Sequence, residues 1–319
     1  MGTPVPPPPP GDRRAAPGRD FAWLGRSGTW TALCLVLLLA GCREQKRAGT
    51  AVTAAPAEIR HPLRGVVVAI KPEAKVLLIQ HEAIPGYMPA MTMEFMVSQG
   101  EVQNARVGQR LRGEMIVRPA GIFLEKIWPD DAATVRRVEA ATQALAQDTA
   151  MRGRGVYREV GETVPDFTLL DQEGRTISGS LFRGHQIVLN FIFTRCPVAT
   201  MCPASTLRMA ALQKAAKTAG VSNLELITFS LDPEYDTPGV LKDYAAARGL
   251  DTRNWSFLTG PDAAVRHLLA QLGILREFEG DTIKHTLATV LVDEQGRIIH
   301  RVDGSAWEPE EFIARMRKP

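Results

Sequence analysis

The chain has 319 residues, of which 45% are hydrophobic, so it is long enough for two domains with ordinary cores. Its formal net charge is only +3, and it contains no dense basic run interleaved with aromatic residues, which argues against nucleic-acid binding. Of the four cysteines, Cys34 and Cys42 belong to an N-terminal export segment. One pair, Cys196 and Cys202, is therefore left for the folded protein.

The N-terminal segment has the features of a bacterial export signal. Basic residues precede Trp30 to Ala40, an apolar stretch of signal-peptide length that is too short to span a membrane as a helix. It ends in Leu39-Ala40-Gly41-Cys42, which resembles the lipobox of bacterial lipoproteins. We therefore expect residues 1–42 to be a lipoprotein signal, with Cys42 lipidated and inserted in a membrane. The alternative is an ordinary signal peptide or an uncleaved anchor.

Residues 43–58 are polar and rich in alanine, as is typical of a tether. Everything after this tether is expected to function outside the cytoplasm, in the periplasm or on the extracytoplasmic face of the membrane.

Residues 59–128 contain short strand-like runs at hairpin spacing, which predict a small, five-stranded, OB-like antiparallel β-barrel. The expected strands are Arg64–Ile70, Lys75–Glu82, Met91–Val97, Arg110–Val117 and Ile122–Ile127.

Methionine is concentrated in this region, where four of the chain's ten methionines lie between Met88 and Met96. Met91 and Met93 are two residues apart, so on a strand they share a face. A thioether is a soft ligand that favours Cu(I), and His81 on the preceding strand is suited to complete the site. The alternative is that these methionines only fill a small core.

The same stretch resembles the CusF family of periplasmic Cu(I)-binding proteins, whose motif is a histidine followed by Trp-Pro-x-Met-Thr-Met. The resemblance implies that His81, Met91 and Met93 are copper ligands. Met88 stands where the family has a tryptophan. Met88 is therefore a candidate fourth ligand, and Tyr87 a candidate aromatic cover for the metal.

Residues 129–159 are expected to be a partly helical linker. An Ala-rich, charged segment, Asp131 to Met151, predicts one helix, which Gly153 and Gly155 end. We interpret it as a semi-rigid spacer.

Residues 160–319 alternate between strand and helix patterns, which predicts an α/β fold of thioredoxin type. The expected elements after Arg175–Ile177 are the buried strand Ile187–Phe193, a helix from Ala204, the strand Leu224–Leu231, helices from Pro238 and over Pro261–Leu272, the strands Thr286–Val292 and Arg297–Val302, and a helix from Glu308.

The cysteine pair lies in the loop between the buried strand Ile187–Phe193 and the following helix. Pro203 suits the first helical position, which puts Cys202 near the positive end of the helix dipole. We expect the dipole to lower the pKa of Cys202, and Arg195 to add positive charge beside Cys196. The alternative is a structural disulfide, although so small a loop stabilises little.

This region also resembles the Sco/SenC family through Val164-Pro165-Asp166-Phe167, Phe193-Thr194-Arg195-Cys196-Pro197, Leu231-Asp232-Pro233, Asp236-Thr237-Pro238 and Lys284-His285-Thr286. The resemblance implies a membrane-anchored, thioredoxin-fold protein that binds copper through Cys196, Cys202 and His285. It also implies a role in assembling the copper centre of cytochrome c oxidase. Two thiolates and an imidazole suit Cu(I) as well as Cu(II).

The chain departs from this family in the spacing of its cysteines, because five residues intervene where most members have three. A second feature favours metal binding. No proline occurs between Pro261 and Pro309, so His285 takes the approximate place of the cis-proline of thiol–disulfide enzymes. His61 is expected to be solvated. Asp232 and Asp236 are expected to serve as turn and cap residues; the alternative is that they hold the metal ligands in position.

Two functions follow. The first is a copper metallochaperone, in which the barrel captures Cu(I) and the thiol domain delivers it to the copper-bearing subunit of cytochrome c oxidase. The second is a thiol–disulfide oxidoreductase that keeps the cysteines of an oxidase subunit reduced; a redox or copper sensor is a third. Because the compartment is oxidising, the first two need a membrane-bound thioredoxin-like reductase as a partner.

Overall fold

The computed structural model describes residues 58–221, 223–280 and 282–316. The expected signal segment and its Cys42 lie outside these residues. The described residues all belong to one compact unit. None of the helices they form is both long and apolar enough to cross a membrane.

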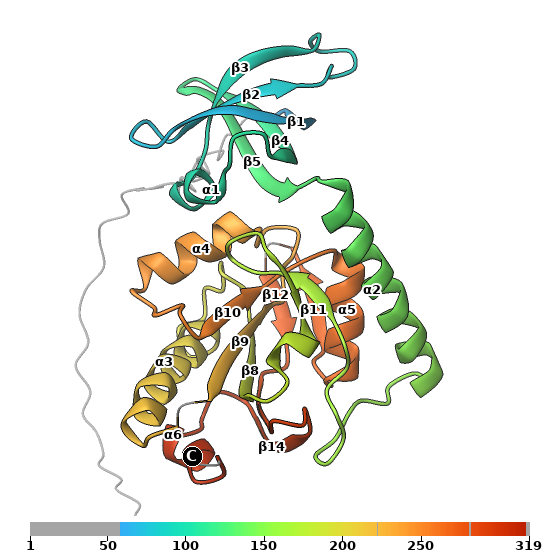
Figure 1. Cartoon of the computed structure of the whole chain (residues 1–319), viewed down its shortest axis with the longest axis vertical. Coiled ribbons are helices and arrows are strands. Elements are labelled where there is room, and N and C mark those ends of the chain that lie inside the picture. Colours follow the sequence, from blue (N-terminus) through green and yellow to red (C-terminus); the bar gives the residue numbers. More distant parts are fainter. Residues whose placement is uncertain (1–57, 222, 281, 317–319) are drawn as a thin grey trace, which may run out of the picture. The chain divides into compact units, whose positions relative to one another are not determined.

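The first part of the described chain is a closed barrel in which the strands follow one another in the order β1-β2-β3-β5-β4 (Figure 1). Its elements are β1 (Arg60–Lys71), β2 (Val76–His81), β3 (Met91–Met96), the short helix α1 (Gln99–Asn104), β4 (Arg110–Arg118) and β5 (Gly121–Pro129). Alternate side chains point inward and build a core that includes Leu63, Val67, Ile79, Phe95 and Met115.

The barrel has the five expected strands, but its pairing is not antiparallel throughout. Neighbouring strands are antiparallel except β3 and β5, which pair in parallel. An odd number of strands cannot alternate in direction around a closed ring, so one pair must be parallel. Helix α1, which was not expected, returns the chain between β3 and β4.

Helix α2 (Ala132–Arg152) packs against the α/β fold rather than standing free as a spacer. Its first turn is capped by Asp131, whose carboxylate accepts the N–H of Thr134 at 2.9 Å. Leu145 is buried in the core of the α/β region, and the side-chain amide of Gln271 donates to Thr149 Oγ1 at 3.0 Å.

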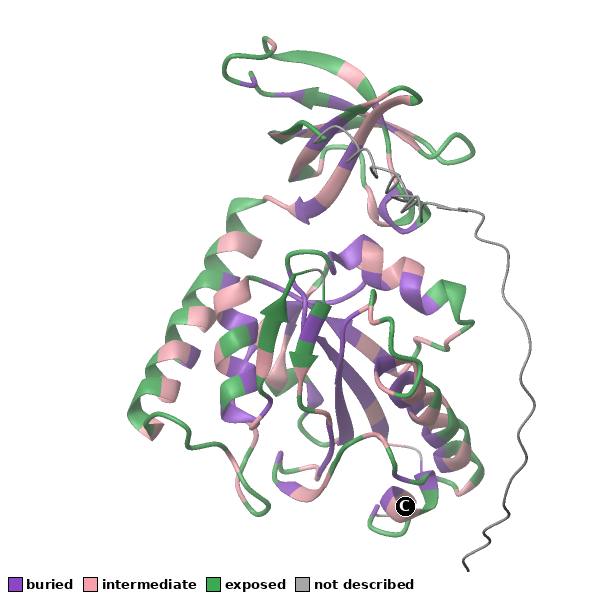
Figure 2. Ribbon diagram, turned by 180° about the vertical axis from the view of Figure 1, so that it is seen from behind, coloured by how far each residue is buried: buried purple, intermediate pink, exposed green. Residues whose placement is uncertain are grey.

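The α/β region is built on a five-stranded sheet of order β10-β9-β8-β13-β14. Its strands are β8 (Gln186–Ile192), β9 (Leu224–Ser230), β10 (Trp255–Leu258), β13 (Ala288–Val292) and β14 (Ile298–Asp303). The strands β10, β9 and β8 run parallel, whereas β13 and β14 add antiparallel pairs. Every residue of β8 and β13 is buried, as the purple strands in Figure 2 show.

Helices cover both faces of this sheet, which confirms the thioredoxin-like fold. In Figure 1, α3 and α6 lie on one side and α5 and α2 on the other. The remaining elements are β6 (Thr168–Leu170), β7 (Thr176–Ser178), the 3-10 turn η1 (Gly179–Phe182), α3 (Cys202–Thr218), α4 (Pro238–Ala247), α5 (Asp262–Gln271), the hairpin strands β11 (Arg276–Glu279) and β12 (Thr282–His285), and α6 (Pro309–Ile313). Strand β10 and the hairpin β11–β12 were not expected from the sequence.

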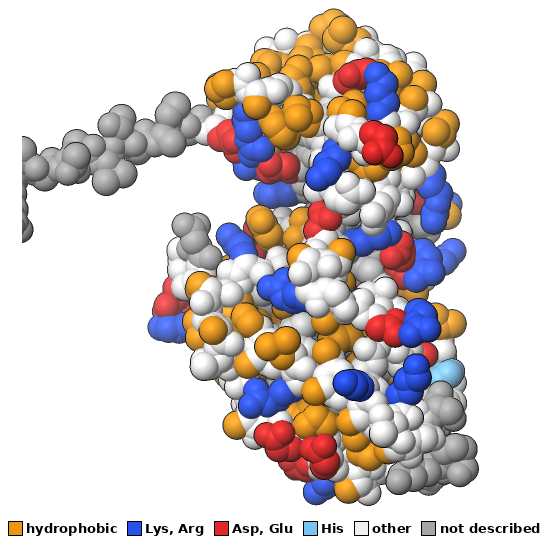
Figure 3. Space-filling model, turned by 90° about the vertical axis from the view of Figure 1, so that its left-hand side faces the viewer, with side chains coloured by type: hydrophobic (Ala, Val, Ile, Leu, Met, Phe, Trp, Pro, Cys, Tyr) orange, Lys and Arg blue, Asp and Glu red, His pale blue; other side chains and the backbone are white. Residues whose placement is uncertain are grey.

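Charged side chains of both signs are interspersed on the surface. On the face in Figure 3, Lys and Arg lie among Asp and Glu without a field of one sign. This distribution agrees with the small net charge of +3.

Candidate metal centres

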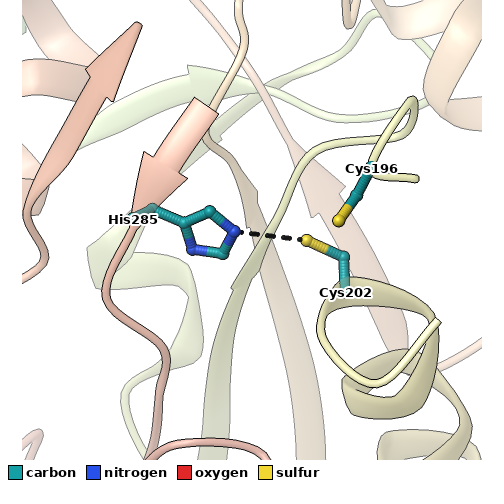
Figure 4. Close-up of side chains that lie close together, drawn as sticks. All are labelled: Cys196, Cys202 and His285. Carbon is teal, nitrogen blue, oxygen red and sulfur yellow. Dashed lines mark hydrogen bonds between the residues drawn. The ribbon is translucent and has the colours of Figure 1, made fainter. Parts of the chain in front are cut away.

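The structure brings Cys196, Cys202 and His285 together at one end of the central sheet. Cys196 lies in the loop after β8, Cys202 begins α3, and His285 ends β12. Their two sulfurs and the nearest imidazole nitrogen all lie within 4.8 Å of one another. Figure 4 shows the three side chains pointing toward a common point. We name this cluster the thiol centre.

His285 presents an unprotonated nitrogen to the sulfurs. Its Nδ1 lies 3.1 Å from the carbonyl oxygen of Thr286, which can only accept, so Nδ1 carries the proton. Its Nε2 faces Cys202 Sγ at 3.6 Å. Burial lowers the pKa of His285, and the ring packs edge-on against Phe193. The imidazole is therefore neutral and oriented as a metal ligand requires.

The two cysteines differ in burial. Cys202 is only 1% exposed, whereas Cys196 is partly accessible. Burial, with the nearby Cys196, raises the pKa of the Cys202 thiol well above its usual range. This finding contradicts the expected lowering by the helix dipole. A dipole contributes about 1 kcal/mol, which desolvation of a buried thiolate exceeds.

Two buried carboxylates hold the residues just before Cys196. Asp236 accepts hydrogen bonds from the Oγ1 and N–H of Thr194 and, at 2.7 Å, from Ser230 Oγ. Asp232 Oδ2 accepts from Arg195 Nε at 2.6 Å. These aspartates are therefore supports of the cysteine loop and more than simple turn and cap residues.

Arg195 does not face Cys196 as a free charge. Its guanidinium pairs with Asp232 and lies over the ring of Tyr235, 5.0 Å from the ring centre. Burial raises the pKa of Asp236 to about 7, despite the hydrogen bonds from Thr194 and Ser230 that favour its charged form. The polar contacts of Asp232 and Asp236 thus anchor the residues that precede Cys196.

A second candidate centre lies in the barrel, where β2 meets β3. His81 is directly opposite Met91 in the strand register, and Met93 follows two residues later on the same face. His81 is 1% exposed, and its Nδ1 lies 2.7 Å from the carbonyl oxygen of Glu82. Its Nε2 is buried and has no hydrogen-bond partner. A soft metal ion shared with the thioethers of Met91 and Met93 would satisfy this nitrogen.

Met88 and Tyr87 lie on the loop between β2 and β3, beside this candidate centre. Met88 is partly buried against the barrel core, and its backbone forms an isolated bridge with Ile84. Tyr87 stacks on His61 with ring centres 3.9 Å apart. His61 is therefore not the freely solvated residue that was expected. Only the alternation of His61 with Leu63 along β1 offered a signal for this contact.

Comparisons with known proteins agree with this division of the chain. Residues 156–319 match the family model SCO1/SenC, and residues 60–129 match the model described as "Copper binding periplasmic protein CusF". The SCO1 protein homolog of Bacillus subtilis (strain 168) is 33% identical over 171 residues, which are 51% of this chain and 86% of that protein.

Two solved structures are also similar to part of the chain. BsSco, described as a member of the Sco family of cytochrome c oxidase assembly proteins with a disulfide switch, is 30% identical, with a TM-score of 0.44; the match covers 50% of this chain and 94% of that one. Copper-bound ScoI of Bradyrhizobium japonicum is 26% identical, with a TM-score of 0.42, over 48% of this chain and 97% of that one.

Proposed function

Because the chain belongs to the SCO1/SenC family, we propose that it is an extracytoplasmic copper metallochaperone, attached to a membrane through a lipid on Cys42. In this role it assists the assembly of the copper centre of cytochrome c oxidase. The proposal rests on one observation above all: the sulfurs of Cys196 and Cys202 and a nitrogen of His285 converge within 4.8 Å.

Copper is the cargo of the thiol centre. Two sulfurs and one imidazole nitrogen form a donor set that suits copper in both oxidation states. Binding requires the loss of two thiol protons, and the metal lowers the pKa of the buried Cys202 as it binds. His285 does not need to lose a proton, because its Nε2 is already unprotonated. Retention of copper is therefore expected to weaken as the pH falls.

The barrel supplies a second Cu(I) site of different character. The thioethers of Met91 and Met93 carry no ionisable proton, so these two ligands bind Cu(I) without releasing one. Transfer to the two thiolates is a ligand exchange without a change in oxidation state. It is favourable because a charged thiolate is a stronger donor than a neutral thioether. Met88 is the candidate fourth ligand of the barrel site.

A second candidate function is thiol–disulfide exchange, favoured by the closeness of the two sulfurs and the accessibility of Cys196. The thiolate of Cys196 would attack a disulfide of an oxidase subunit and form a mixed disulfide. Attack by Cys202 on Cys196 would then release the reduced subunit and leave a Cys196–Cys202 disulfide. Two electrons pass to the substrate, and a membrane-bound thioredoxin-like reductase returns the pair to its reduced form.

A Cu(I) titration separates these functions. The chain without residues 1–53, which precede the compact unit, is reduced and titrated against a Cu(I) chelator as wild type and as Cys196→Ser. The metallochaperone requires two bound Cu(I) ions in the wild type and one in the variant. One ion in both proteins would restrict copper to the barrel and favour the thiol–disulfide function. No bound ion in either would overturn both site assignments.

A further inference from the structure

We propose that helix α1 of the barrel positions the loop that carries Cys196, with Glu101 as the positioning residue. The inference builds on the proposed function, since it takes the thiol centre as the working site. It makes the barrel more than a copper-capturing module, because one of its side chains then sets the geometry of a site on another part of the chain.

Two glycines allow α1 and α4 to touch. A Cβ atom on Gly100 would overlap the carbonyl oxygen of Gly239, and a Cβ on Gly239 would overlap the carboxyl group of Glu101. Neither glycine has the positive φ that would explain its presence by backbone conformation. The close approach of the two helices is therefore the physical reason for a glycine at each position.

Hydrogen bonds hold this contact on both sides of the glycines. Thr237 Oγ1 donates to Glu101 Oε1 at 3.1 Å, and the N–H of Gly100 donates to Asp243 Oδ1 at 2.7 Å. Further along α1, Lys242 Nζ donates to Asn104 Oδ1 at 3.0 Å. Glu101 is only 7% exposed and Thr237 is fully buried, so water does not compete for their bond.

The contact continues directly to the thiol centre. Thr237 follows Asp236, whose carboxylate binds the backbone and side chain of Thr194. At the other end of the same short segment, Asp232 binds Arg195. Thr194 and Arg195 immediately precede Cys196. A displacement of Thr237 is therefore transmitted through two buried carboxylates to the position of the Cys196 sulfur.

The position of that sulfur controls the chemistry of the centre. Cys202 is fixed at the start of α3, where Thr206 Oγ1 donates to its carbonyl oxygen at 3.0 Å. Cys196 lies on a loop, so the distance between the two sulfurs depends on how this loop is held. Closing a disulfide requires a specific sulfur geometry, and the equilibrium between dithiol and disulfide reports any change in it.

The test measures this equilibrium in the full chain with glutathione redox buffers. Glu101→Ala and Thr237→Val each remove one side of the hydrogen bond, whereas Glu101→Gln keeps the accepting oxygen. Glutamine is a close mimic because burial raises the pKa of Glu101 to about 8, so the carboxyl group is largely protonated at pH 7. Glu73→Ala, an exposed change elsewhere on the barrel, is the matched control.

We expect Glu101→Ala and Thr237→Val to shift the thiol–disulfide constant in the same direction by about fivefold, the effect of one hydrogen bond. Glu101→Gln and Glu73→Ala should stay within about twofold of the wild type. Unchanged constants in both Glu101→Ala and Thr237→Val, with circular dichroism showing intact folds, would overturn the inference. If Glu101→Ala does not fold, the test rests on the other two variants. A shifted constant in Thr237→Val and an unchanged one in Glu101→Gln would then support the inference, and an unchanged constant in Thr237→Val would overturn it. The redox measurement uses no copper, so it is independent of the copper titration. Absence of copper from the wild-type thiol centre in that titration would overturn the proposed function and leave the redox result unaffected.

Discussion

The imidazole Nε2 of His285 lies 3.6 Å from the sulfur of Cys202, although 83 positions separate the two residues in the sequence. The hairpin β11–β12 makes this contact possible, because it extends from the end of α5 and returns with His285 as its last residue. Phe193, at the end of the buried strand, packs edge-on against the ring and limits its rotation. The histidine is thus held in place before any metal arrives.

Replacement of His285 by alanine should selectively impair Cu(II) binding at the thiol centre. Loss of a second-sphere partner already costs about 10- to 100-fold in metal affinity, so loss of a ligand should weaken Cu(II) binding by about 100-fold or more. Cu(I), which two thiolates can hold, should be affected less. Titrations followed by the thiolate-to-copper absorption measure both effects.

The matched control for this change is His267→Ala, which removes a histidine on α5 outside the cluster. It should bind Cu(II) like the wild type. Equal Cu(II) affinities for His285→Ala and the wild type would show that the imidazole is not a ligand.

The two cysteines should react with alkylating agents at different rates. Cys196 is partly accessible, whereas Cys202 is buried and its thiol pKa is raised by that burial. In the reduced, metal-free chain without residues 1–53, iodoacetamide at pH 7 should therefore modify Cys196 first, and mass spectrometry of the peptides will identify the site. Cys196→Ser should be nearly unreactive, and Cys202→Ser should retain most of the reactivity of the wild type. Faster labelling of Cys202 would contradict this assignment of accessibility.

The sequence predicted the members of the thiol centre better than their electrostatics. Short motifs around Cys196 and His285 identified the three residues that the structure brings together. They could do so because the family that carries these motifs has its ligands in separate, distant motifs. The sequence predicted a lowered pKa for Cys202, and this prediction was wrong, because burial raises it. Its position at the start of α3 was visible in the sequence, but the burial that outweighs the helix dipole depends on tertiary packing, which brings Cys196 and Asp236 close to it.

Elements without a periodic pattern escaped prediction. Helix α1 is six residues long, which is too short to show a repeating apolar face. The hairpin β11–β12 is mostly exposed, and its alternation is correspondingly weak. The burial of Glu101 was also invisible, since a glutamate is rarely buried unless it is paired or neutral. In the structure its carboxyl group lies against Gly239 and accepts a hydrogen bond from Thr237.

In the barrel, Met91→Leu should weaken Cu(I) binding without destabilising the metal-free protein. The exchange nearly conserves side-chain volume, and Met91 is 47% exposed, so the free energy of unfolding should change by less than about 1 kcal/mol. Loss of the thioether should lower the Cu(I) affinity of the barrel by about tenfold or more. Chelator competition in a Cys196→Ser background isolates this site.

Met96→Leu provides a control on the same strand. Met96 is also partly exposed but points to the opposite face of β3 from Met91 and Met93. Its replacement should leave Cu(I) affinity unchanged. A similar loss of affinity in both variants would mean that the methionines of β3 do not act as ligands through one face.

The stability of the metal-free protein should fall as the pH rises toward 8, and Glu101 should account for part of the fall. Burial raises the pKa of Glu101 from 4.5 in the unfolded chain to about 8. A carboxyl group with a raised folded-state pKa stabilises the native state fully below its unfolded pKa, and this contribution is lost as the pH rises through the folded pKa. Between these values the slope approaches about 1.4 kcal/mol per pH unit.

Glu101→Gln removes this titration while it keeps the accepting oxygen, so its stability should depend less steeply on pH. Urea unfolding at pH 5.5, 6.5 and 7.5, with reductant and a metal chelator present, measures the difference between variant and wild type. Asp236, whose pKa is raised to about 7 by burial, acts in the same direction, and His285, with its lowered pKa, acts in the opposite one. Both titrate in variant and wild type alike, so their effects cancel in the difference. Parallel pH profiles for the two proteins would show that Glu101 is charged in the native state. Glutamine would then be a poor mimic of Glu101, and Glu101→Gln would no longer be expected to keep the thiol–disulfide constant of the wild type.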